Sequence, residues 1–442
     1  MGSILSFVQA NALLVSTCIL ILAYIFIAAE KLPKVTIALS GATLTLLFGL
    51  LGQNQKVDGV LDKFYFINYV DWNVIFLLVS MMIIVSITAR SGIFSWLANE
   101  MLKKTKGHPK MILVCLALFT AFASAFLDNV TTVILIMPIT FVIAEKLEIN
   151  PIPFLITEIL ASNIGGTATL IGDPPNIIIG SAAGLSFMDF INELTGIIIL
   201  ILCVIIAIMA VWFGKYLKTT PEKMEQIINL DNSKTISDNK LMVRSLSTLL
   251  LVILGFMTHD ITHIQTSVCA MAGASFLLLF EKPDEIFNDV EWNTIFFFIG
   301  LFVIIGGFEK AGGIEIMAKW LIDVTHGSQT LASMFILWGS GILSGIIDNI
   351  PYTATMTPMI AEISAAKGAA FALPLWWCLS LGACLGGNLT IIGAAANVIV
   401  SETAASKGHK IEFLQYLKYG FVCMFVSLAL SSIYIWVRFL RG

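Results

Sequence analysis

The chain has 442 residues, of which 58% are hydrophobic and only 12% charged, and its formal net charge at pH 7 is −4. Because soluble domains carry about 25% charged residues, this composition excludes a soluble globular protein. Repeated apolar runs of about 20 residues are typical of transmembrane helices, whereas an outer-membrane barrel shows short alternating segments. The sequence therefore predicts an all-α polytopic protein of the cell (inner) membrane, and the absence of a basic run argues against nucleic-acid binding.

Taken in chain order, the apolar runs form two sets separated by a polar segment. The first set covers residues 10–29, 35–51, 73–89, 111–127, 130–144, 152–182 and 192–214. The second covers residues 245–258, 264–280, 293–308, 330–347, 350–366, 371–400 and 412–437. The two sets match in number and order, which indicates an internal repeat.

Three blocks of letters establish the repeat. "VDWNVIFLLVS" from Val70 matches "VEWNTIFFFIG" from Val290, and "SAFLDNVTTVILIMPIT" from Ser124 matches "SGIIDNIPYTATMTPMI" from Ser344, both at an offset of 220 residues. "IGGTATLIGDPPNII" from Ile164 matches "LGGNLTIIGAAANVI" from Leu385 at an offset of 221. We predict a first repeat at 1–214, a linker at 215–244 and a second repeat at 245–442.

Each repeat is expected to contain a re-entrant hairpin, at 111–144 and 330–366, besides about five full spans. An odd number of spans makes the two repeats inverted relative to each other, as in many transporters. Lys and Arg are enriched in cytoplasmic loops, and their distribution places the linker 215–244 on the cytoplasmic side.

The hairpin tips carry the first group of candidate binding residues. A charged side chain at membrane depth marks an ion or proton path by default. Helix capping by Asp is the alternative role, although its presence at equivalent positions of both halves favours function. The candidate residues are Asp128, Asn129, Thr131 and Thr132 in the first half, and Asp348, Asn349 and Thr353 in the second.

The second group lies in two predicted broken helices, at 152–182 and 371–400. Gly permits non-helical backbone and Pro ends helices, and such backbone at membrane depth must be buried in protein or line a polar cavity. A packing kink between helices is the alternative. The candidate residues are Asn163, Gly165, Gly166, Thr167, Thr169, Asp173 and Asn176, together with Gly386, Gly387, Asn388, Thr390 and Asn397. Ala394 replaces Asp173 in the second half, so we expect an asymmetric site.

Proton coupling is assigned to Asp128, Asp348 and Glu158, because a carboxylate removed from water binds a proton more readily. For Glu158 a hydrogen bond between helices is an equally good alternative. The five histidines all fall in loops and none has a metal-binding spacing such as HExxH. We therefore expect neither a cofactor nor enzymatic activity, and no metal other than a transported cation.

The motif pair "FLDNVTT…MPIT" and "NIGGTATLIGDPPN" resembles the ion transporter superfamily, which includes arsenite permeases, sodium/proton antiporters, the P protein, and dicarboxylate and citrate carriers. The resemblance implies a scaffold domain and a transport domain, a homodimer and an elevator-type motion. In the dicarboxylate branch the tips read Ser-Asn-Thr and bind sodium and substrate carboxylates. The Asp-Asn tips of this chain resemble the arsenite-permease and P-protein side instead.

These features predict a secondary active transporter, a proton-coupled antiporter that exports arsenite, antimonite or another small inorganic solute. The coupling ion is expected to be H⁺ or Na⁺. A sodium/proton antiporter that uses the same aspartates is one alternative, and a sodium-coupled dicarboxylate, citrate or other anion carrier is another. An ion channel is the alternative from a different functional class.

Overall fold

The computed structural model describes residues 8–52, 56–57, 60–61, 65–228, 232 and 235–441. These residues are almost entirely helical, apart from a short antiparallel ladder between β1 (Lys56–Val57) and β2 (Val60–Leu61). Nine helices in the described part of the chain are long and apolar enough to cross a membrane. The prediction of an all-helical protein with many membrane spans is confirmed.

The helices of the first half follow the predicted apolar runs. They are α2 (Ala12–Ala29), α3 (Lys34–Leu47), η1 (Tyr65–Tyr69), α4 (Trp72–Arg90), α5 (Ile93–Lys104), α6 (Pro109–Ser124), α7 (Asn129–Leu147), α8 (Ile152–Gly166), α9 (Pro174–Ala183) and α10 (Phe187–Phe213). Among them α3, α6 and α8 are shorter than a full span.

The second half continues in the same manner. Its elements are α11 (Pro221–Ile228), α12 (Asn239–Met257), α13 (His259–Thr262), α14 (Thr266–Leu278), α15 (Pro283–Phe287), α16 (Trp292–Lys310), α17 (Gly313–Val324), α18 (Gln329–Ile347), α19 (Asn349–Lys367), α20 (Ala369–Gly386), η2 (Ile391–Gly393), α21 (Ala395–Ser406), α22 (Phe413–Ile435) and η3 (Trp436–Leu440). The series α4–α10 and α16–α22 agree in order. The inverted orientation of the two halves stays a prediction.

The predicted linker contains helical structure. The short helix α11 packs against α5 and α7, and α12 begins at Asn239, inside the range 215–244. Asp238 caps α12 by accepting hydrogen bonds from the backbone N–H groups of Lys240 and Leu241. A polar capping residue therefore starts this helix several residues before its apolar run.

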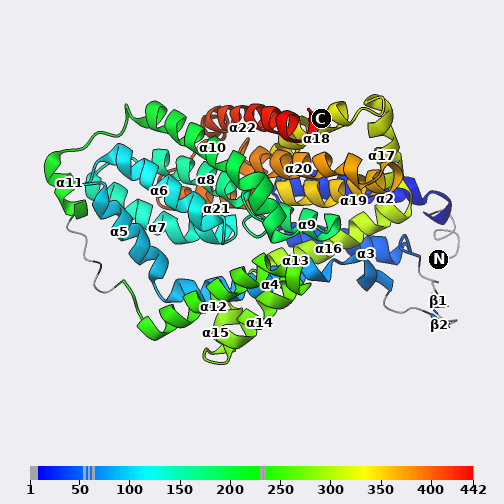
Figure 1. Ribbon diagram of the computed structural model, residues 1–442, viewed down its shortest axis with the longest axis horizontal. Helices are drawn as coiled ribbons and strands as arrows, with labels where there is room; N and C mark the ends of the chain where they lie inside the picture. The colour runs from blue at the N-terminus through cyan, green and yellow to red at the C-terminus, as the bar shows by residue number, and fades with distance from the viewer. Residues whose placement is uncertain are drawn as a thin grey trace.

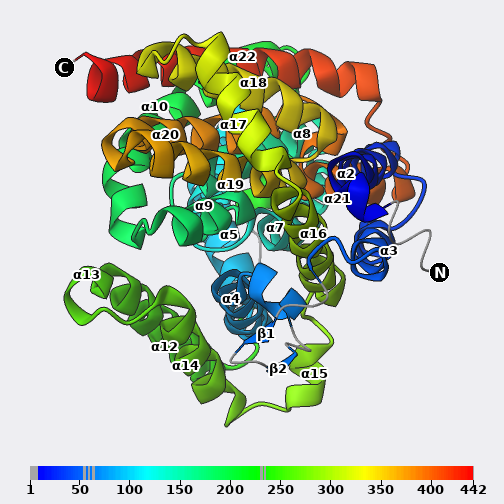
Figure 2. The ribbon, with the colours of Figure 1, turned by 90° about the vertical axis from the view of Figure 1, so that its right-hand side faces the viewer.

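One helix of each half packs against a helix of the other half. The first-half helix α3 packs against α16 of the second half, and the second-half helix α14 packs against α4 of the first. Figures 1 and 2 show α12 and α14 beside α4 on one side of the molecule, away from α8 and α20. A side chain at Gly300 of α16 would lie 2.7 Å from the carbonyl carbon of Ala38 in α3. The backbones of α3 and α16 thus meet closely because glycine removes the side chain.

Both predicted hairpins exist as pairs of helices joined at the expected tip. α6 ends at Ser124 and α7 begins at Asn129, while α18 ends at Ile347 and α19 begins at Asn349. An Asp precedes the first residue of the second arm in each hairpin and caps that helix. Helix capping, the alternative role of the tip aspartates, is therefore present at both tips.

The structure has a helix break within each of the two predicted ranges. α8 ends at Gly166 and α9 restarts at Pro174, and α20 ends at Gly386 before α21 restarts at Ala395. Pro174 and Pro175 occupy the first turn of α9, where a missing N–H removes no helical hydrogen bond. The backbone between the half-helices is buried, as non-helical backbone at membrane depth must be.

Candidate functional site

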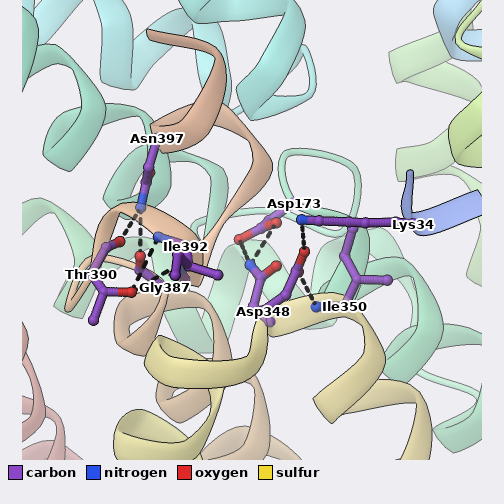
Figure 3. Close-up of polar contacts among 10 residues, drawn as sticks. Lys34, Asp173, Asp348, Ile350, Gly387, Thr390, Ile392 and Asn397 are labelled. Carbon is purple, nitrogen blue, oxygen red and sulfur yellow. Dashed lines mark hydrogen bonds and ion pairs between the residues drawn. The ribbon is translucent and has the colours of Figure 1, made fainter. Parts of the chain in front are cut away.

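The two hairpin tips meet at the carboxylate of Asp173, in the first helix break. The side-chain amide of Asn349 donates to Asp173 Oδ1 and Oδ2 at 3.3 Å each, and that of Asn129 donates to Asp173 Oδ1 at 3.3 Å. Asp173 is completely buried. One carboxylate therefore holds equivalent asparagines from both halves. Figure 3 shows Asp173 beside Asp348 and Lys34.

Asp173 has no acidic counterpart in the second half, where Ala394 takes its place. Asn129 and Asn349 occupy equivalent positions in the two repeats, yet both contact Asp173. The expected asymmetry is thus an unduplicated residue shared by the two tips.

A chain of amides extends from the tips into both helix breaks. Asn129 donates to Asn163 Oδ1 at 3.2 Å, and Asn163 donates to Asn388 Oδ1 at 3.0 Å and Asn397 Oδ1 at 2.9 Å. All these side chains are buried. Since a buried amide must pair its polar groups, this network ties α7, α8 and α21 to the second break.

The repeated threonines and asparagines hold the non-helical backbone. Asn176 donates to the carbonyl oxygens of Thr167 and Thr169, and Asn397 donates to those of Gly387 and Thr390. Thr169 and Thr390 bond backbone carbonyls at the ends of α6 and α18 in the same way. These four side chains fix the shape of the breaks.

The repeated glycines lie where backbones touch. A Cβ atom at Gly165 would lie 2.2 Å from the carbonyl oxygen of Ala121 in α6, and one at Gly386 would lie 2.5 Å from that of Gly341 in α18. At Gly166 the corresponding distance is 2.6 Å to the carbonyl oxygen of Gly172. Close helix packing accounts for Gly165 and Gly386, as the alternative of a packing kink predicts, whereas Gly166 meets the backbone of the break itself.

The two tip aspartates differ in their partners. Asp128 accepts hydrogen bonds from the backbone N–H of Thr131 at 2.8 Å and from its hydroxyl at 2.5 Å. Asp348 is 1% exposed and pairs with the ammonium of Lys34 at 2.5 Å (Figure 3). Within the described residues Asp128 has no basic partner within 4 Å. Equivalent residues therefore sit in different electrostatic environments.

A cavity of about 250 Å³ lies between the hairpin tips and the helices α3, α4 and α16. Four carboxylates line it, and a single lysine opposes them. The charged lining residues are Asp128, Asp173, Glu291, Asp348 and Lys34. Groups of three or more His, Cys, Asp or Glu arranged to hold a metal ion are absent from the described ranges.

Three other predicted residues do not line the cavity. Thr353 donates to the carbonyl oxygen of Asn349, and the hydroxyl of Thr132 has no hydrogen-bond partner in the described part of the chain. Glu158, which is 2% exposed, accepts a hydrogen bond from Thr140 of α7 at 2.5 Å. Glu158 thus links α7 to α8 and does not line the cavity.

The fold and this site can be compared with known proteins. A sequence profile described as "Citrate transporter", CitMHS, matches residues 24–382. The chain belongs to this family. The resemblance to the ion transporter superfamily is confirmed, and the protein is a transporter with multiple membrane-spanning helices.

Several known proteins match nearly the whole length of this chain. Two uncharacterized transporters of Mycobacterium tuberculosis (strain ATCC 25618 / H37Rv) are 41% and 39% identical over 429 and 431 residues, which is 96% of this chain and 98% and 99% of theirs. The human P protein is 29% identical over 504 residues, and the match covers 96% of this chain but 59% of the P protein. The YdaH transporter of Alcanivorax borkumensis shares the fold, with a TM-score of 0.53 at 12% identity, covering 96% of this chain and 98% of that one.

Sequence reasoning missed two charged residues of the cavity. Lys34 follows Pro33 and reads as a loop cation, but it begins α3 and reaches the second tip. Glu291 is equivalent to Asp71 in the repeat, and its acidic side chain precedes α16 at the cavity wall. The matching acid-Trp-Asn triplets at residues 71–73 and 291–293 are a signal that could have identified Glu291.

Proposed function

We propose that this transporter is a proton-coupled antiporter whose cavity carries a small solute without net negative charge. One observation carries the proposal: four carboxylates and a single lysine line the cavity where both tips meet. An uncompensated buried charge is costly, so the carboxylates must bind protons, cations or hydrogen-bond donors during transport. Exchange of protons for solute at Asp128 and Asp348 satisfies this requirement on both sides of the membrane.

Two classes of solute fit this cavity. Arsenous acid and related metalloid hydroxides are neutral near neutral pH and offer hydroxyl donors to carboxylates. Na⁺ is a hard cation that prefers oxygen ligands, like Mg²⁺ and Ca²⁺. We retain the metalloid hydroxide as the first candidate and Na⁺ as the second.

The family description favours a third solute, citrate. Citrate is a polyanion near neutral pH, so four carboxylates would repel it unless protons or cations bound with it. Citrate therefore belongs to the proposal only as an ion pair with a cation. An elevator-type motion, a homodimer and a cytoplasmic location for the linker complete the proposal.

Flux through the purified full chain in proteoliposomes tests this function. A pH-sensitive dye reports proton movement after pulses of arsenite, NaCl, citrate or citrate with MgCl₂. We expect one of these solutes to release protons from the wild type, and we expect Asp128→Asn and Asp348→Asn each to abolish that release because the titrating group is lost.

The matched control is Glu315→Gln, which removes an exposed carboxylate that pairs with Lys319 within one helix. Surface pairs of this type contribute little, so the control should retain wild-type coupling. Proton release that persists undiminished in both aspartate variants would refute the assignment of coupling to the tips.

A further inference from the structure

Lys34 occupies a position that is unfavourable for a lysine. It is the first residue of α3, and the N-terminal end of a helix carries a partial positive charge that repels cations. Its side chain is 26% exposed and lines the cavity. The ion pair with Asp348 compensates for this unfavourable position.

Asp348 is equally unusual. Its backbone φ is +104°, a left-handed conformation that side-chain-bearing residues rarely adopt, whereas φ of the equivalent Asp128 is −65°. Asp348 Oδ1 accepts from the backbone N–H of Ile350 at 3.1 Å, and Oδ2 accepts from Lys34. The second tip is thus held in a strained conformation that contacts α3.

The neighbouring helix α2 supports this contact. The hydroxyl of Tyr24 donates to the carbonyl oxygen of Pro351 at 2.6 Å and contacts the hydroxyl of Thr355. Two polar links therefore join α2 and α3 to the second tip. The other ionisable groups near the pair are Glu30, Asp173, Tyr24 and Tyr352.

We propose that Lys34 is a tethered cation that competes with the coupling cation, H⁺ or Na⁺, for Asp348. The ammonium lies 2.5 Å from Asp348 Oδ2, the place that a bound proton or Na⁺ would take. A cation that binds Asp348 must first displace Lys34 from that carboxylate. Displacement also releases the second tip from α3, so cation binding and tip movement are coupled. This inference rests on the proposed function only in identifying the competing species as the coupling cation.

Cation binding to the detergent-purified full chain tests the proposal without transport. The unfolding temperature is measured against NaCl at fixed pH, with choline chloride holding ionic strength, and against pH without Na⁺. We expect Lys34→Met to lower the half-saturating Na⁺ concentration about tenfold or more, or to move the pH midpoint upward by about one unit or more, because the competitor is gone.

Three further variants make the outcome decisive. Lys34→Arg should keep the wild-type half-saturating Na⁺ concentration and pH midpoint, because it keeps the cation. Lys31→Met, which removes an exposed lysine three residues earlier in the chain, should also leave both values unchanged. Asp348→Asn in the Lys34→Met background should cancel the gain. If Lys34→Met leaves the half-saturating Na⁺ concentration and the pH midpoint unchanged, or makes cation binding weaker, the lysine is merely structural and the proposal is overturned. A failed flux assay with the expected gain would instead refute the proposed function alone.

Discussion

At the scale of single residues, the site depends on one carboxylate that accepts hydrogen bonds from both hairpin tips. Asp173 is buried, and when it is ionised each donor that it receives stabilises it more than a neutral hydrogen bond would. Asn349 supplies two of its three side-chain amide contacts. Loss of that asparagine leaves the buried carboxylate poorly compensated.

We predict that Asn349→Ala lowers the free energy of unfolding by about 1.5–3 kcal/mol, the range for hydrogen bonds to charged groups. Chemical unfolding in detergent micelles measures the change. The exposed Asn288 is the matched control, and Asn288→Ala should change stability by less than about 0.5 kcal/mol.

The cause is tested by a double-mutant cycle with Asp173→Asn. The cost of Asn349→Ala should shrink when residue 173 carries no charge, because the two side chains are coupled. Equal costs in both backgrounds would show that Asn349 acts through another contact.

At the scale of elements, the helix breaks are built by close backbone contact between each hairpin and its broken helix. The hydroxyl of Ser124 donates to the carbonyl oxygen of Ser162 at 2.8 Å, and that of Ser344 donates to the carbonyl oxygen of Ala383 at 2.9 Å. The same contact thus recurs in both halves. It requires small residues at the crossing, and Gly165 provides the closest approach.

We expect Gly165→Ala to lower the free energy of unfolding by about 1–3 kcal/mol or more, because the new methyl group would overlap the backbone of α6. The unfolding temperature in detergent measures the effect. Gly196 in α10 is the matched control, since its Cβ would meet nothing within 4 Å. Gly196→Ala should be neutral or stabilising by up to about 1 kcal/mol, owing to the higher helix propensity of alanine. Equal effects at the two sites would contradict the packing explanation.

At the scale of the whole molecule, neither half is complete without the other. α3 packs on α16 and α14 packs on α4, so each half buries one of its helices against its partner. The tips and both breaks meet in one amide network that crosses between halves. The cavity consequently forms only when both halves are assembled.

This arrangement predicts the behaviour of a chain divided between α11 and α12. The two pieces, co-expressed with a tag on one, should co-purify from membranes, because the crossed helices bury apolar surface between them. Gly300→Ala should reduce recovery of the untagged piece by bringing a methyl group within 2.7 Å of the Ala38 backbone, while Gly196→Ala should not. Recovery that is insensitive to Gly300→Ala would show that the α3–α16 contact does not hold the halves together.

The sequence by itself determined the helical class and the positions of the tips and the breaks. These features depend on local chemistry: apolar length selects spanning helices, Asp caps a helix, and Gly and Pro end one. The repeat made the tips and the breaks recognisable, because Asp128 and Asp348 lie in matching stretches of sequence.

Only the tertiary structure decided which charges face one another. Both tips contact the single Asp173, Lys34 pairs with Asp348, and Glu291 lines the cavity. These contacts join residues that lie far apart along the chain. Charge interactions depend on distance in space and on burial, and neither can be read from sequence spacing.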